Sequence, residues 1–169
     1  MYPTEHLVEQ YIHYIKRWFT ITNIVAKNNK EIDILALDTN GNCYHIEVSV
    51  HKGGLQWGPE GNDGDKVKNY KEAKFNDEIT NFIKERYGVT KVNNIWVCWG
   101  IHPKKEKLAL SEGEKYGIEI WQLKNIVRDL WKEIGTANYG DDIIQALSIV
   151  KEAIFSKKAN SQNYDICNL

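Results

Sequence analysis

The segment EIDILALDTNGNCYHIEVSVHK, residues 31–52, constrains the fold more than any other part of the sequence. Apolar and β-branched residues flank the polar stretch DTNGN, which predicts two antiparallel strands joined by a tight turn. Each strand also carries one acid where a neutral residue would pack more easily, Asp33 in the first strand and Glu47 in the second. The length of the turn decides whether these two carboxylates meet.

Two registers of this hairpin are compatible with the sequence. A two-residue turn, Asn40-Gly41, would place Asp33 and Glu47 on opposite faces of the sheet. A three-residue turn ending at Gly41 would place the two acids directly opposite each other on one face. Glycine suits the last position of such a turn because it adopts the left-handed conformation without steric cost. The sequence alone permits both arrangements.

The three-residue register would create a candidate metal site. Directly opposed residues have Cβ atoms about 5 Å apart, so two carboxylates there repel unless they share a proton or bind a cation. Oxygen ligands with several open positions suit Mg²⁺ or Mn²⁺. The alternative is a pair of solvated acids on the surface of a strand. The sequence leaves both possibilities open at this point; if Asp33 and Glu47 are metal ligands, Mg²⁺ or Mn²⁺ is the expected cofactor.

The rest of the chain predicts an α/β protein with a central mixed β-sheet flanked by helices. Expected elements are a helix over 4–19, a strand over 19–27, the hairpin, a glycine-rich loop over 51–64, helical residues 65–87 with a break near Phe75 and Asn76, a strand over 92–100, a basic loop over 101–108, a strand after 117, and helices over 123–134 and 141–157. Residues 1–158 are expected to form one domain, and the polar residues 159–169 to fray.

Composition narrows the class of protein. The 169 residues are 42% hydrophobic and 27% charged, as in an ordinary soluble domain. No apolar run approaches the roughly 18 residues of a membrane helix, and the polar N-terminus is not a secretion signal. Three scattered cysteines favour a reduced cytoplasm. A net charge of −1 means that nucleic acid could bind only through local basic patches.

The order of motifs resembles the PD-(D/E)xK, or restriction-endonuclease-like, nuclease superfamily, which includes restriction enzymes, junction resolvases and recombination exonucleases. The resemblance rests on a helix, a strand, a strand carrying Asp33, and a strand ending in Glu47-Val48-Ser49, and covers most of residues 4–134. It implies that the Asp and Glu bind a divalent ion and that a Lys two residues after the Glu positions or activates the attacking water. The lysine position is occupied here by Ser49.

A serine carries no positive charge, so another residue would have to supply it. Candidates near the hairpin are Lys30, Lys52 and Lys66. We favour Lys66, because Lys66 to Tyr70 resembles a Gln-x-x-x-Tyr motif that exonuclease relatives carry on the helix after the Glu strand. The alternative is that Lys66 is a solvated residue in the first turn of a helix.

Further candidate residues for catalysis or nucleic-acid binding are suggested by the same resemblance or by the chemistry of their side chains. Glu5, in Glu5-His-Leu-Val8, resembles an acid on the first helix of the family, with Glu9 as a second candidate. Expected nucleic-acid contacts, through phosphate pairing or stacking, are Lys52, Trp57, Lys68, Tyr70, Lys104 and Lys105. The alternative for these lysines is an ordinary solvated surface.

Aromatic rings and histidines admit two interpretations. His45 and His51 share the face of Glu47 by alternation, so either could touch a metal or a phosphate, or could serve a structural role. Trp96, Trp99 and Trp121 are expected to pack in the core or at its edge.

Two hypotheses follow. The first is a metal-dependent nuclease that hydrolyses DNA, with RNA as the second choice. The second is a catalytically inactive module with the nuclease fold that binds nucleic acid or a protein partner, in which Ser49 records the loss of catalysis. Whether the chain is an enzyme stays open at this point, and a homodimer is compatible with the sequence.

Overall fold

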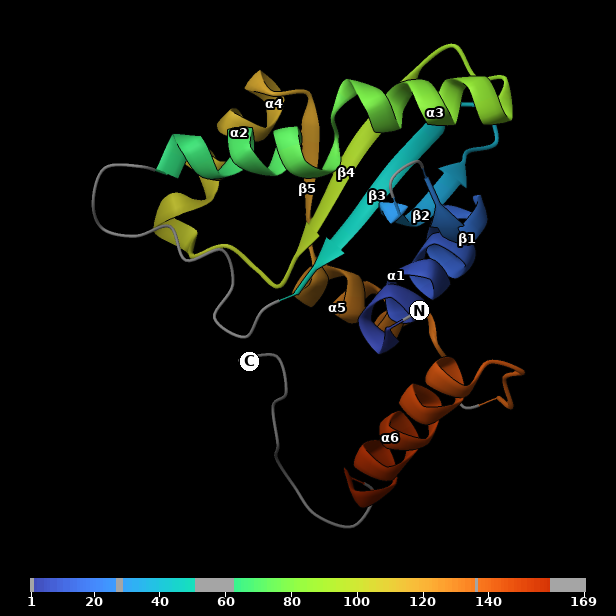
Figure 1. The fold of residues 1–169 in the computed structure, drawn as a ribbon. Coiled ribbons are helices and arrows are strands. Elements are labelled where there is room, and N and C mark those ends of the chain that lie inside the picture. The colour runs from blue at the N-terminus through green and yellow to red at the C-terminus, as the bar shows by residue number, and fades with distance from the viewer. Residues whose placement is uncertain (1, 27–28, 51–62, 136, 159–169) are drawn as a thin grey trace.

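The computed structural model describes residues 2–26, 29–50, 63–135 and 137–158 (Figure 1). Its strands are β1 (Phe19–Val25), β2 (Glu31–Leu37), β3 (Cys43–Ser49), β4 (Val92–Cys98) and β5 (Ile118–Gln122). They form a five-stranded sheet in the order β1-β2-β3-β4-β5. β1–β2 and β2–β3 pair antiparallel, whereas β3–β4 and β4–β5 pair parallel. The predicted mixed sheet is therefore confirmed.

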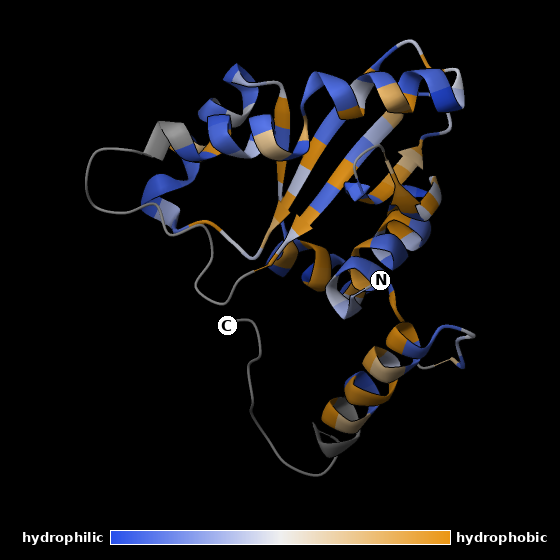
Figure 2. Ribbon diagram, viewed as in Figure 1, coloured by the Kyte–Doolittle hydropathy of each residue, from blue (hydrophilic) through white to orange (hydrophobic). Residues whose placement is uncertain are grey.

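Helices cover both faces of this sheet, which confirms the predicted α/β class (Figure 1). One face packs against α1 (Pro3–Tyr11) and α5 (Leu123–Glu133). The other packs against α2 (Asp63–Lys74), α3 (Asp77–Tyr87) and α4 (Glu106–Lys115). The apolar residues of the strands lie between these two helical layers (Figure 2).

The hairpin adopts the three-residue turn. Its ladder pairs Ile34 with Ile46 and continues to Leu37 and Cys43. At the turn itself, Asp38 N donates to Asn42 O at 3.0 Å. Gly41 has φ +81°, the left-handed conformation that favours glycine at this position. In this register Asp33 falls opposite Glu47.

Two element boundaries differ from the prediction. The first helix ends at Tyr11 and continues as a π-helical segment over Ile12–Lys16, and Arg17, at φ 60°, then turns the chain into β1. The predicted basic loop is shorter than expected, because a 3₁₀ turn over Pro103–Lys105 leads directly into α4.

The break between α2 and α3 is confirmed. The Asn76 side chain accepts a hydrogen bond from Ile79 N at 3.1 Å and caps the start of α3. Phe75, immediately before it, is buried. Because Phe75 anchors this corner, the C-terminal end of α2 is held against the sheet.

The last described helix, α6 (Asp142–Lys158), extends away from the body of the protein (Figure 1). Its first turns are attached through the buried Ile144 and through a 2.7 Å contact between His6 Nε2 and Asp141 Oδ2. None of the helices in the described ranges has the length and apolar character needed to cross a membrane. The predicted single domain stays a prediction, and residues 159–169 lie outside the described residues.

Candidate functional site

Glu47 is the centre of the candidate site. Its side chain, near the C-terminal end of β3, is only 1% exposed. His45 Nε2 lies 2.9 Å from its Oε1, and Lys74 Nζ lies 2.7 Å from its Oε2. Oε2 receives no hydrogen bond of regular geometry from the described residues, so we treat the Lys74 contact as an ion pair. A carboxylate this buried is expected to be charged only with such compensation.

Asp33 lies at an interruption in the sheet. The β2–β3 ladder ends at Ile34 and Ile46, one residue before Asp33 would pair with Glu47. On the other side its partner by register is Asn23, which leaves the extended conformation with φ 57°. Asp33 Oδ2 instead accepts a hydrogen bond from Val48 N at 2.7 Å. The two strands are thereby joined through a side chain beside Glu47.

The environment raises the pKa of Asp33 to about 6. Burial is the largest cause, and the negative charge of Glu47 is the next. The hydrogen bond from Val48 N and the charge of Lys74 act in the opposite direction but do not cancel the increase. Asp33 and Glu47 are therefore close enough to repel each other, as the predicted site requires.

Lys74 provides the cation beside Glu47. It is the last residue of α2 and is directly followed by Phe75, whose ring centroid lies 4.8 Å from that of His45. Burial lowers the pKa of Lys74, but its contact with Glu47 and the charge of Asp33 outweigh this and raise it overall. The Lys74 side chain is 41% exposed, and the raised pKa keeps its ammonium charged.

The predicted cationic residues occupy other places. Lys66 is exposed on α2, eight residues before Lys74, or about 12 Å along the helix axis. Lys30 forms an ion pair with Glu78 at 2.9 Å. Lys52 lies outside the described residues, as do His51 and Trp57. Lys74 is thus the lysine that the structure brings to Glu47, and the sequence analysis did not nominate it for this role.

Ser49 contacts Tyr70 rather than replacing the missing lysine. A side-chain hydrogen bond joins the two residues, and the Tyr70 ring stacks on Trp96 with centroids 3.9 Å apart and an interplanar angle of 12°. Burial, followed by the charges of Glu47 and Asp33, strongly raises the pKa of Tyr70. One face of Tyr70 is therefore covered, and its neutral hydroxyl lies near both acids.

Glu5 lies on the other side of Asp33. Both side chains line a pocket of about 140 Å³, with Tyr2 and Asn23 among the other lining residues. Glu5 Oε2 accepts a hydrogen bond from Tyr2 N at 3.0 Å, and its charge contributes to the raised pKa of Asp33. The alternative acid, Glu9, instead contacts His6 and Thr20.

The predicted nucleic-acid contacts that the structure describes are mostly on the surface. Lys68 is exposed, 3.9 Å from Glu72, Lys104 is exposed and Lys105 is half-buried. Trp96 is buried, as predicted, but Trp99 is 49% exposed and so differs from the prediction of a packed ring. β4 ends at Cys98, so Trp99 projects just beyond the edge of the sheet.

The donors present fit a hard divalent ion. Asp33 and Glu47 supply carboxylate oxygens that repel each other, and Lys74 Nζ lies 2.7 Å from Glu47 Oε2. Such an ion binds well to one or two carboxylates while keeping several waters. Within the described residues, no three His, Cys, Asp or Glu side chains form a group that could hold a metal. The described residues therefore fit a site in which two carboxylates, those of Asp33 and Glu47, hold the ion.

The sequence predictions do not include the Lys74–Glu47 ion pair or the His45–Glu47 contact. The place of Lys74 directly before the apolar Phe75 is a signal that this end of α2 turns inward. His45 was noted on the Glu47 face, but nothing in the sequence showed that the two side chains would touch.

Comparisons with known proteins add little to this geometry. No model of a known protein family matches the sequence. No curated protein sequence matches it either. Among solved structures, the chain is similar to a repair endonuclease from Pyrococcus abyssi, with 20% identity and a TM-score of 0.40 over 72% of the present chain. The match spans 47% of that protein, and a similarity this distant carries no information about which side chains act here.

Proposed function

We propose that the protein is a metal-dependent nuclease that hydrolyses phosphodiester bonds of DNA, with RNA as the second choice. The observation that carries the proposal is the buried Glu47 carboxylate, held between His45 and Lys74 and beside Asp33, whose pKa is raised. Two carboxylates that can hold a divalent ion and an ammonium beside them are groups that promote hydrolysis of a phosphodiester.

Asp33 and Glu47 would hold the ion, Mg²⁺ or Mn²⁺. When bound, such an ion supplies Lewis acidity and lowers the pKa of a coordinated water. Glu5, which lines the same pocket as Asp33, would add a negative charge near Asp33 and favour cation binding. The hydrogen bond from Val48 N fixes the Asp33 carboxylate in place.

Lys74 would stabilise negative charge on the phosphate. Its ammonium already lies 2.7 Å from Glu47 and its side chain is 41% exposed, so a short movement of the four-carbon stem would reach a bound phosphate. Lys66 remains the alternative source of this charge. Lys52, Trp57, Lys68, Lys104 and Lys105 are proposed to contact the nucleic acid outside the site.

The test is cleavage of single- and double-stranded DNA and RNA with Mg²⁺ or Mn²⁺. Wild type should cleave at least one substrate in a metal-dependent way, and Glu47→Gln should not. Glu85→Gln, at an exposed position on α3, is the matched control and should behave as wild type. Equal cleavage by wild type and Glu47→Gln would show a contaminating nuclease and remove the proposal.

The inactive module remains the second candidate because of two observations. Lys74 compensates Glu47 without a metal, and the family's lysine position is occupied by a serine engaged with Tyr70. A protein that binds nucleic acid but cleaves none under any of these conditions would favour the module.

A further inference from the structure

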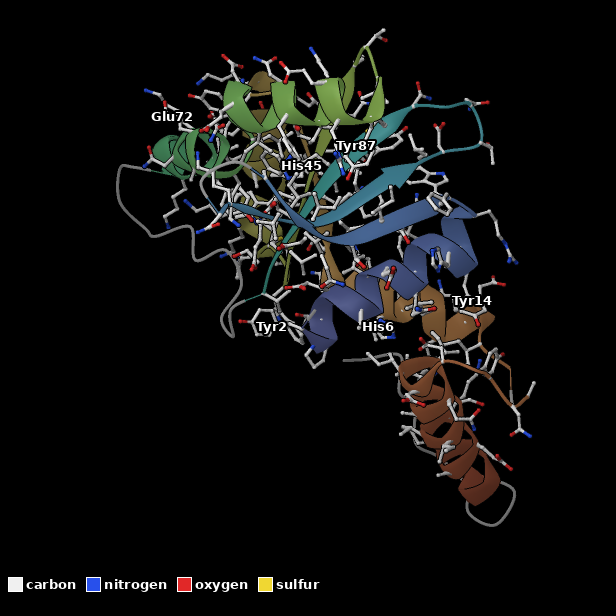
Figure 3. All side chains as sticks on the ribbon, turned by 45° about the vertical axis from the view of Figure 1, so that its right-hand side comes forward. Tyr2, His6, Tyr14, His45, Glu72 and Tyr87 are labelled. Carbon is white, nitrogen blue, oxygen red and sulfur yellow. The ribbon has the colours of Figure 1, made fainter. Side chains whose placement is uncertain are left out.

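We propose that His45 is a positioning residue that orients the Glu47 carboxylate for a divalent ion; this rests on the proposed function. His45 precedes Glu47 by two residues on β3, so both side chains leave the same face of the sheet. Their side chains are 0% and 1% exposed, and His45 Nε2 lies 2.9 Å from Glu47 Oε1. Figure 3 shows His45 between the strands and the helical layer above them.

The protonation of the ring follows from its partner. A carboxylate oxygen accepts, so Nε2 carries the hydrogen and donates it to Glu47. Nδ1 is buried and has no hydrogen-bond partner in the described part of the chain. A histidine that serves only the fold usually satisfies both ring nitrogens, whereas the described polar contact of His45 is with Glu47. The Phe75 ring meets the imidazole edge-on at 73° and fixes its plane.

His45 and Lys74 hold the carboxylate in different ways. His45 has a short side chain on a rigid strand and contacts Oε1. Lys74 has a long, partly exposed side chain at a helix end and contacts Oε2. The Lys74 side chain can therefore move from Glu47 toward a bound phosphate. The contact with His45 then still holds Oε1 of Glu47, and Oε2 of Glu47 becomes available to the ion. Residues that form a hydrogen bond with a metal ligand, without contacting the metal themselves, set the orientation of that ligand.

The surrounding strip of the sheet is polar where packing alone would favour apolar residues. Asn94 Oδ1 and Trp96 Nε1 are also buried without hydrogen-bond partners among the described residues. The β3–β4 register places Asn94 beside His45 and Trp96 beside Glu47. Unsatisfied buried polar atoms are rare in native proteins and are explained by an ordered water, an ion, strain or a catalytic role. Here they lie on the strip of the sheet that carries the His45–Glu47 pair.

A pair of amide substitutions separates positioning from packing. His45→Gln places an amide nitrogen near the position of Nε2 and can still donate to Glu47. His45→Asn places its amide near the position of Nδ1 and cannot reach Glu47. By calorimetry, Mn²⁺ affinity should stay close to wild type in His45→Gln and fall by about 10–100-fold in His45→Asn, the range for loss of a group that orients a metal ligand. His45→Leu, a compact apolar variant, should weaken Mn²⁺ as His45→Asn does and serves if His45→Asn fails to fold.

A second readout needs no metal. In thermal melts with chelator present, the shifts caused by His45→Asn and Glu47→Ala should be non-additive in the double variant, because each removes the same contact. Equal Mn²⁺ affinities in His45→Gln, His45→Asn and His45→Leu, with normal metal-dependent cleavage, would overturn the positioning role and leave the nuclease intact. A wild-type protein that binds no Mn²⁺ would instead overturn the proposed nuclease and this role with it.

Discussion

Lys74 Nζ, at the end of α2, lies 2.7 Å from Oε2 of the buried Glu47 on β3. This contact compensates the negative charge that β3 carries into the interior. It also places an ammonium at the site although the position two residues after Glu47 is a serine. The structure thus brings an ammonium to Glu47 from the end of α2 rather than from β3.

The stability of the protein should depend on this ion pair. Lys74→Ala leaves Glu47 without its cation and should lower the free energy of unfolding by about 1–3 kcal/mol, less than for a fully buried pair because Lys74 is 41% exposed. Adding Glu47→Gln in the same chain should recover most of the loss. Urea unfolding at pH 7 measures both. A double variant no more stable than Lys74→Ala would show that the ammonium does not compensate Glu47.

The raised pKa of Asp33 predicts how stability depends on pH. Its pKa is about 6 in the folded protein against an ordinary value of 3.8, so the folded state binds the proton more tightly than the unfolded chain. The contribution of Asp33 to the stability of the folded protein is complete below pH 3.8 and is lost as the pH rises through about 6.

Asp33→Asn should therefore melt at a higher temperature than wild type at pH 8 in metal-free buffer. The difference should disappear below about pH 4, where Asp33 is protonated in both states. Saturating Mn²⁺ should stabilise wild type and not Asp33→Asn. Melting curves that keep the same separation at pH 4 and pH 8 would contradict the assigned pKa.

Cleavage by lysine variants should identify the catalytic cation. Lys74→Ala should reduce cleavage by about 10²-fold or more, the scale of losing one electrostatic stabiliser. Lys66→Ala should reduce it far less, because Lys66 lies about 12 Å farther along α2. Lys132→Ala, an exposed position on α5, is the control for general charge effects. The reverse ranking of Lys74 and Lys66 would restore the assignment made from the sequence.

A lysine at position 49 should partly replace Lys74. In the Lys74→Ala background, Ser49→Lys should recover part of the lost activity, because position 49 lies two residues beyond Glu47 on the same face of β3. In the wild-type background the same change should add little, since a second ammonium would repel Lys74 and displace Tyr70. Single-turnover cleavage rates of the four proteins give the comparison. No recovery would indicate that Lys74 acts through the position of α2 rather than through its charge.

The hairpin turn should depend on glycine. Gly41 has φ +81°, a conformation that costs other residues about 1 kcal/mol or more. Gly41→Ala should therefore lower the free energy of unfolding by about 1 kcal/mol, and Gly41→Asn by less, because asparagine tolerates this region. Chemical unfolding of both variants tests the order. Equal stability of Gly41→Ala and wild type would argue against the left-handed turn.

Much of the fold and part of the site were determined by the sequence. The hairpin was defined by the alternating apolar residues of β2 and β3 and by the turn residue Gly41. Strand periodicity and turn chemistry are local properties that the sequence shows directly. The same pattern singled out Asp33 and Glu47 as acids in an apolar setting. Asn76 likewise marked the start of α3, because a helix cap depends on neighbouring residues alone.

Only the tertiary structure decided which side chains join the two acids. The turn register, which the sequence left open, brought Asp33 beside Glu47, because packing of a whole strand face against helices permits one alignment. The lysine at the site was decided by how α2 lies over the sheet, with Phe75 held against His45. Helical periodicity describes which lysines share a face, but not where a helix end comes to rest. That position depends on long-range packing, and it selected Lys74 over Lys66.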